Sequence, residues 1–254
     1  MQPEISPPAE PLCHDCVFGP LIGDGDVMRF VITNSMTIML VMMLGLIIVA
    51  FAVRRSLSTV PGGLQNFMET LIETVDGVVQ PALGKYATRL FPLIASFFIF
   101  ILFANWFSLL PFVGTIGYIE EHGGHDVLIP WLRPATADMN MTLALALLAF
   151  LTIHVSGIVS HGPFGHLKAL SQNIMLAPIF IIIELFVIVS LSFRLFGNLF
   201  AGEVLLGMAS WILPIVGVGF YLLEVLFGLI QAIIFTMLTL SFTSVSIGTS
   251  EEHA

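Results

Sequence analysis

The chain has 254 residues, of which 57% are hydrophobic and only 10% are charged. Soluble domains carry about 25% charged residues, so this composition excludes a soluble globular protein and predicts a predominantly helical integral membrane protein with one membrane domain. Eight Lys and Arg residues, with no basic run and a formal net charge of −9, argue against nucleic-acid binding.

Residues 1–30 form a polar, proline-rich tail that holds both cysteines, Cys13 and Cys16. Their CxxC spacing fits a tail without chemistry, a disulfide or an adventitious metal site. We favour the first interpretation because the chain contains no second cysteine pair. No cleavable signal peptide is expected, since the first apolar run begins late and is long enough to cross a membrane.

Three apolar segments, at residues 31–53, 91–110 and 139–159, are each long enough to cross a bilayer core of roughly 30 Å. Residues 61–81 differ, because apolar residues recur there at helical spacing and acidic residues occupy the gaps. This pattern predicts an amphipathic helix at the membrane interface. We expect it to contact a protein, since its acidic face suits anionic lipid poorly.

The loop at residues 112–138 contains His122 and His125 together with the acidic residues Glu120, Glu121 and Asp126. These residue types can bind a metal, but their spacing matches no metal motif and the loop has no cysteine. We therefore favour a solvated loop. A short loop is expected at residues 161–172. No cofactor is expected, and no GxxxxGK[ST] nucleotide motif occurs.

Two long apolar runs, residues 174–213 and 215–247, form the last region, 173–248, and are separated by Pro214. As helices they measure on the order of 60 Å and about 50 Å. Both exceed the bilayer core, and their apolar residues make protrusion into water unfavourable. The sequence therefore predicts an all-α protein with three ordinary spans, one interfacial helix and a strongly tilted C-terminal hairpin.

Loop charges predict the orientation of the chain in the membrane. Arg29 and Arg133 fall on one side, and five cations fall on the other: Arg54, Arg55, Lys85, Arg89 and Lys168. The positive-inside rule then places the N-terminus outside and the C-terminus in the cytoplasm.

Arg194 is the remaining cation, and it lies in the middle of the first long apolar run. An arginine at the centre of a bilayer costs roughly 2.5–3.5 kcal/mol on insertion scales, so such residues are functional candidates. The positions three and four residues away hold Ser190, Leu191, Gly197 and Asn198, none of which is acidic. The counter-ion of Arg194 must therefore be distant or on another chain.

At about 100° per residue, Arg194 shares one helix stripe with Ser190, Gly197, Asn198 and Ala201. Small residues allow another helix to approach closely. The stripe fits packing within the chain or, as we favour, a seam for a partner helix that carries a carboxylate. The same rotation turns Glu203 to the opposite face.

Pairing the two halves of the hairpin places Arg194 level with Gln231, and Glu203 within a turn of Glu224. Glu203 lies about 13 Å from Arg194 toward the outside, and Glu184 about 15 Å toward the inside. Membrane acids without a cation partner usually line a water path, although each can also be a simple hydrogen-bonding group. Two such paths, separated by a fixed cation that favours ionised carboxyl groups, can pass protons in two steps.

The segment SLSFRLFGNLFAGE (190–203), with Gln231 in LIQAIIF, resembles subunit a of F-type ATP synthases. Further matches are TNSM at 33–36, PGGLQNFMETLIETV from Pro61, NWFSLLP at 105–111 and TADMNMTLALAL from Thr136. The CHDC segment in the tail does not belong to this pattern.

The resemblance implies a stationary proton-path (rarely sodium-path) subunit beside a rotating c-subunit ring, with peripheral-stalk b-type subunits and the rest of the F1F0 complex as partners. It implies a non-catalytic subunit, in a bacterial plasma membrane rather than an organelle membrane. Arg194 matches the family's stator arginine. Asn198, Glu203 and Gln231 match polar positions of the path. Glu224 stands where members carry His or an acid, and Glu184 is similar to an acid of the inner half-channel.

A second hypothesis is a self-contained transporter or channel in which Arg194 binds an anionic substrate. That hypothesis predicts internal repeats with broken helices, and the sequence shows none.

Overall fold

A computed structural model describes residues 17–18, 30–31, 34–55, 57–58, 62–113, 116–122, 125–170, 177–212 and 214–248. Within these ranges the helices are α1 (Asn34–Arg55), α2 (Gly63–Leu83), α3 (Ala87–Ser108), α4 (Met139–Leu170), α5 (Ala177–Ile212) and α6 (Pro214–Ile247). Two short 3-10 turns, η1 (Gly84–Tyr86) and η2 (Ala135–Ala137), precede α3 and α4.

Five stretches of the described chain are long and apolar enough to cross a membrane, and one of them runs from α2 through α3. The sequence-based prediction of a multi-span helical membrane protein is therefore confirmed. The amphipathic segment forms a helix of its own, α2, which η1 separates from α3. Cys13, Cys16 and the last six residues lie outside the described residues.

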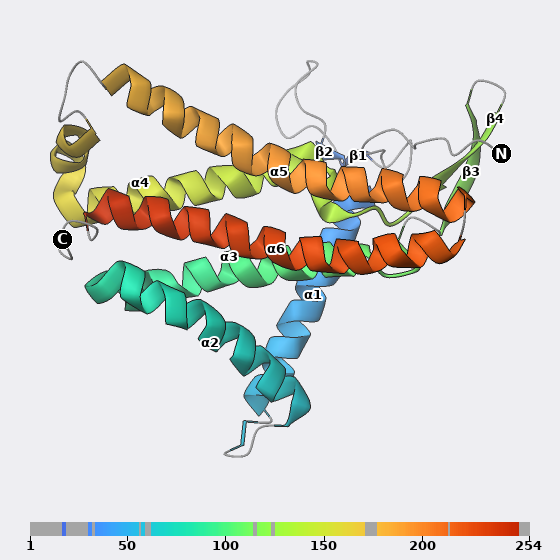
Figure 1. Cartoon of the computed structure of the whole chain (residues 1–254), viewed down its shortest axis with the longest axis horizontal. Coiled ribbons are helices and arrows are strands. Elements are labelled where there is room, and N and C mark those ends of the chain that lie inside the picture. Colours follow the sequence, from blue (N-terminus) through green and yellow to red (C-terminus); the bar gives the residue numbers. More distant parts are fainter. Residues whose placement is uncertain are drawn as a thin grey trace.

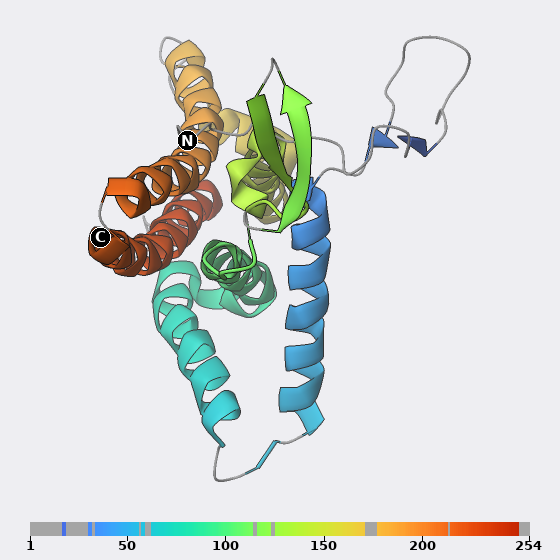
Figure 2. The same ribbon diagram turned by 90° about the vertical axis from the view of Figure 1, so that its right-hand side faces the viewer.

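Helices α3, α4, α5 and α6 lie side by side and form the body of the molecule (Figure 1). The chain reverses direction between α5 and α6, which lie against each other. Helix α1 runs steeply across the direction of these four helices. The C-terminal end of α1 and the N-terminal end of α2 both lie away from them (Figure 2). The body therefore does not share the direction of α1.

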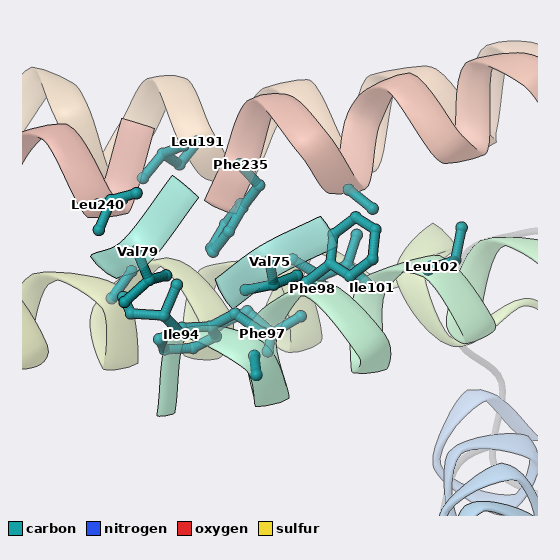
Figure 3. Packing of buried hydrophobic residues seen from close by; sticks show 14 of the residues in the cluster. Val75, Val79, Ile94, Phe97, Phe98, Ile101, Leu102, Leu191, Phe235 and Leu240 are labelled. Atoms are coloured by element: carbon teal, nitrogen blue, oxygen red, sulfur yellow. The ribbon is translucent and has the colours of Figure 1, made fainter. Parts of the chain in front are cut away.

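The core of this body lies between α2, α3, α4, α5 and α6. Figure 3 shows Leu191 of α5 and Phe235 of α6 facing Ile94 and Phe97 of α3, and the rings of Phe97 and Phe235 lie 5.8 Å apart. Ala146 and Ala149 of α4 are fully buried. Residues of this size let helices approach closely in a membrane, where close packing drives association.

Three side-chain hydrogen bonds fix α6 against the end of α3. Asn105 Nδ2 donates to the Gly228 carbonyl at 3.2 Å, and Trp106 Nε1 donates to the Val225 carbonyl at 3.2 Å. Tyr221 donates its hydroxyl proton to the Leu109 carbonyl at 2.8 Å. Because these bonds lie on both sides of Glu224 along α6, they set the position of that carboxyl group.

The structure departs from the predicted connections in two places. The predicted loop at residues 112–138 contains a β-hairpin of β3 (Gly117–His122) and β4 (His125–Pro130), in which His122 pairs with His125. Each strand contains two β-branched or aromatic residues, and two glycines separate the strands in the sequence, a combination that can indicate a hairpin. A second short strand pair joins β1 (Val17–Phe18) to β2 (Phe30–Val31).

The second departure concerns residues 161–172, which were expected to form a loop. Helix α4 instead continues to Leu170 across a break at Gly162, where φ is 74° and ψ is 164°. Only glycine adopts such angles readily. The chain therefore changes direction at one residue and then resumes a helix.

Candidate functional site

The described residues of α5 differ in solvent exposure between two sides of the helix. Leu191, Leu195 and Leu199 recur every four residues and are at most 2% exposed, so they define the side that packs against the body. Ser190, Arg194 and Ala201 are exposed, and Gly197 and Asn198 are half-buried. Three of the five residues of the predicted seam are thus exposed, and none of the five is fully buried.

Arg194 is exposed on this open side. Among the side chains that the structure describes, no carboxylate lies within ion-pair distance of its guanidinium group. A fixed positive charge on an apolar helix is costly in a membrane without a counter-ion. The open side of α5 is therefore electrostatically incomplete within the described part of the chain.

Gln231 lies on α6 and is 5% exposed. Its Nε2 atom has no hydrogen-bond partner within the described ranges. A buried amide can donate and accept hydrogen bonds without changing charge. Such a group suits positioning rather than proton exchange.

Glu203 and Glu224 approach each other where α5 and α6 meet. The Glu224 carboxyl group lies against Gly202, and a Cβ atom at that position would come within 2.7 Å of Glu224 Cδ. Glu203, the next residue, is close enough to act electrostatically on Glu224. The structure thus brings together two acids that the sequence placed within one helical turn.

A third charged group joins these acids, and the sequence analysis missed it. Arg133, between β4 and η2, is 2% exposed and places Nη2 3.7 Å from Glu203 Oε2. Glu203 therefore has a cation partner, which corrects the expectation that the membrane acids are unpaired. Arg133 was counted only as a loop charge, although it is the single cation in residues 112–138 and lies between Leu132 and Pro134.

The connection around Arg133 is held in place by backbone bonds and burial. The Trp131 N–H donates to the Ile116 carbonyl at 2.9 Å. After Arg133, the η2 residues Ala135, Thr136 and Ala137 are at most 4% exposed. The guanidinium group therefore reaches Glu203 from a fixed support.

Two sets of predicted residues lie outside the described side chains. Glu184 falls within α5, but only its helical backbone is described. The side chains of Glu120, Glu121, His122, His125 and Asp126 are likewise outside the described set. Among the residues that were described, no group of three or more His, Cys, Asp or Glu side chains is arranged to hold a metal ion.

Comparison with known proteins gives a consistent result. Residues 35–244 match the family model described as ATP synthase A chain. The chain is 36% identical over 231 residues to ATP synthase subunit a of Mycobacterium ulcerans, covering 87% of this chain and 90% of that protein. It is 37% identical over 206 residues to ATP synthase subunit a 3 of Pelobacter propionicus, covering 78% of this chain and 80% of that protein.

Proposed function

The chain belongs to the ATP synthase A chain family, and we propose that it is the stationary proton-path subunit of the F0 sector. Family membership implies proton translocation as part of the F1F0 complex, without a catalytic site in this subunit. The bacterial relatives and the five membrane-capable stretches support a multi-pass protein of the bacterial plasma membrane.

The observation that carries the proposal is the exposed Arg194 on an apolar helix. Its counter-ion must come from outside the described part of the chain, because no described carboxylate is within reach. A rotating ring of c subunits would supply one carboxylate after another. Arg194 would favour the ionised form of each carboxylate as it passes, and would repel protons that might leak directly across.

The acids on either side of Arg194 give the two half-channels. Each proton would enter from outside past Glu224 and Glu203, protonate a ring carboxylate, travel with the ring, and leave past Glu184. Asn198 and Gln231 would orient the exchanging groups by hydrogen bonding. A potential of 100 mV contributes about 2.3 kcal/mol per charge, so several protons must be summed by rotation to make one ATP.

The geometry of the helices supports a steeply tilted hairpin. Helix α5 has 36 residues and measures about 54 Å, which is far longer than the bilayer core. If α1 crosses the membrane directly, α5 and α6 must lie obliquely within it, because α1 runs across their direction (Figure 2). The loop charges place the N-terminus outside and the C-terminus in the cytoplasm.

Helix α2 offers a surface for the peripheral stalk. Its exposed residues combine large apolar side chains, such as Leu64 and Phe67, with the acid Glu73, and a second acid, Glu69, is half-buried. This mixture suits a protein partner such as the b-type subunits better than an anionic lipid surface.

The proposal is tested by replacing Arg194 with Ala and with Lys in membranes that contain the whole complex. Proton-driven ATP synthesis should be lost with Ala and strongly reduced with Lys, since a lysine cannot reproduce the broad guanidinium geometry. Arg55→Ala, which removes the same charge at the exposed end of α1, is the matched control. ATP synthesis retained in both Arg194 variants, or ion flux through the reconstituted chain alone, would contradict the proposal.

A further inference from the structure

Three ionisable side chains from separate parts of the chain form one cluster, which we call the acid–arginine cluster: Arg133, Glu203 and Glu224. Arg133 is 2% exposed and Glu224 is 8% exposed. Glu203 is more open, with 32% of its side chain exposed, and its Oε2 atom lies 3.7 Å from Arg133 Nη2. The Glu224 carboxyl group lies against the backbone of α5 at Gly202, one residue from Glu203.

The charges of this cluster do not cancel when both acids are ionised. Two carboxylates and one guanidinium group then leave a net charge of −1. Two carboxylates that share a site cannot both ionise easily, and a buried charge requires a partner. The cluster becomes neutral when it holds one proton, and it returns to −1 when that proton leaves.

The surroundings of the two acids differ, which assigns them different tasks. Glu203 faces Arg133 and is already neutralised by it. The Oε2 atoms of both acids are buried without a hydrogen-bond partner among the described residues, but of the two only Glu203 Oε2 lies within ion-pair distance of a cation there. The acid without a cation is therefore the one whose ionised form is less stable and which gains most from binding a proton.

We propose that Arg133 is a positioning residue that makes the acid–arginine cluster a single-proton relay. Arg133 keeps Glu203 as a fixed carboxylate, and Glu224 accepts and releases the proton. One O–H bond forms on Glu224 when a proton arrives from outer water. The same bond breaks when that proton passes to a ring carboxylate, while Arg133 and Glu203 keep their charges. This inference rests on the proposed function of the chain as a proton path.

The relay makes a specific prediction for charge-changing variants in the whole complex. Arg133→Gln leaves two negative charges, so a second proton would be needed for neutrality. Glu203→Gln leaves one positive and one negative charge, so binding a proton would create a net positive charge. Each single variant should slow proton-driven ATP synthesis by about tenfold or more, because an uncompensated buried charge is strongly unfavourable.

The double variant Arg133→Gln with Glu203→Gln restores the original charge cycle, since Glu224 alone then alternates between −1 and neutral. Its ATP synthesis, expressed per assembled complex, should exceed that of either single variant. Arg133→Lys, which keeps the charge, should also retain more activity than Arg133→Gln. A double variant no better than Glu203→Gln alone would overturn the relay, and this comparison holds even if Arg133→Gln fails to assemble.

A second experiment displaces the Glu224 side chain by a substitution that changes no charge. A Cβ atom at Gly202 would overlap the end of the Glu224 side chain, whereas nothing lies within 4 Å of a Cβ atom at Gly207 on the same helix. Gly202→Ala should therefore slow proton uptake while Gly207→Ala does not. Equal rates in these two variants would contradict the assigned position of Glu224. Neither result depends on Arg194, so failure of the relay is distinguishable from failure of the proposed function.

Discussion

Two polar regions lie along α5, the seam around Arg194 and the acid–arginine cluster around Arg133, and they provide opposite environments for an arginine. Arg133 is 2% exposed and lies beside Glu203, whereas Arg194 is exposed and no described carboxylate is within its reach. The same contrast holds for Ser192, which is 1% exposed and lies 3.1 Å from the Thr142 hydroxyl, and Ser190, which is exposed.

This difference indicates where the chain is complete and where it needs a partner. Polar groups in the membrane are stable when their partners are close, as they are for Arg133 and Ser192. Arg194 is exposed, and none of the carboxylates that the structure describes lies beside it. The packed side of α5 therefore acts as a support, and we infer that another polypeptide completes its open side.

The largest effect on proton uptake is expected when the acid–arginine cluster can no longer accept a proton. Replacing Glu203 and Glu224 together by Gln removes both carboxylates of the proposed outer path, so proton uptake and proton-driven ATP synthesis should stop. The measurement is acidification-driven ATP synthesis in vesicles that contain the whole complex.

Asp138→Asn is the matched control for this double variant. It also removes a carboxylate near the start of α4. The side-chain oxygen that accepts the Asn140 N–H at 2.9 Å is kept, because Asn caps a helix as well as Asp. Proton uptake unchanged in the Glu203/Glu224 double variant would show that the outer path runs elsewhere.

The sequence was sufficient to predict features that depend on helical periodicity. The angles of Ser190, Arg194 and Ala201 around one helix follow from their spacing, and the structure places all three on the exposed side. The apolar runs likewise predicted where the long helices lie, except that α4 continues to Leu170 through a segment that was expected to be a loop.

Features that depend on the path of a connection could not be predicted in this way. Arg133 meets Glu203 because the chain after β4 returns to α5, and no local pattern encodes that return. The space at Gly202 for the Glu224 carboxyl group likewise depends on how α5 and α6 pack. Periodicity identifies which face a residue occupies, but tertiary packing decides what that face meets.

A smaller effect, on stability, is expected from Gly228→Ala on the packed side of α6. The added Cβ atom would lie 2.9 Å from Asn105 Cβ and would disturb the bond from Asn105 Nδ2 to the Gly228 carbonyl. Asn105 Cβ is attached to the backbone and cannot move away freely. Overpacking of this kind costs typically about 1–3 kcal/mol.

The thermal midpoint for release of the subunit from the detergent-solubilised complex should therefore fall for Gly228→Ala. Gly219→Ala is the control, because Gly219 is exposed on the same helix and nothing lies within 4 Å of its added Cβ atom. Equal midpoints for the two variants would mean that the contact between α3 and α6 is looser than the structure indicates.

The smallest expected effect on the thermal midpoint comes from two serines that lie on opposite sides of α5. Ser192→Ala removes a hydrogen bond to Thr142 between two buried hydroxyl groups, and bonds of this kind average about 0.6 kcal/mol in a membrane protein. Ser190→Ala changes the exposed seam and should leave the same thermal midpoint unaltered.

A double-mutant cycle of Ser192→Ala with Thr142→Val isolates the bond, because the second substitution should cost little once the first is present. If Ser190→Ala lowered the midpoint as much as Ser192→Ala in the absence of the ring, the exposed side of α5 would have to be packed within the chain. The partner surface inferred for Arg194 would then be lost.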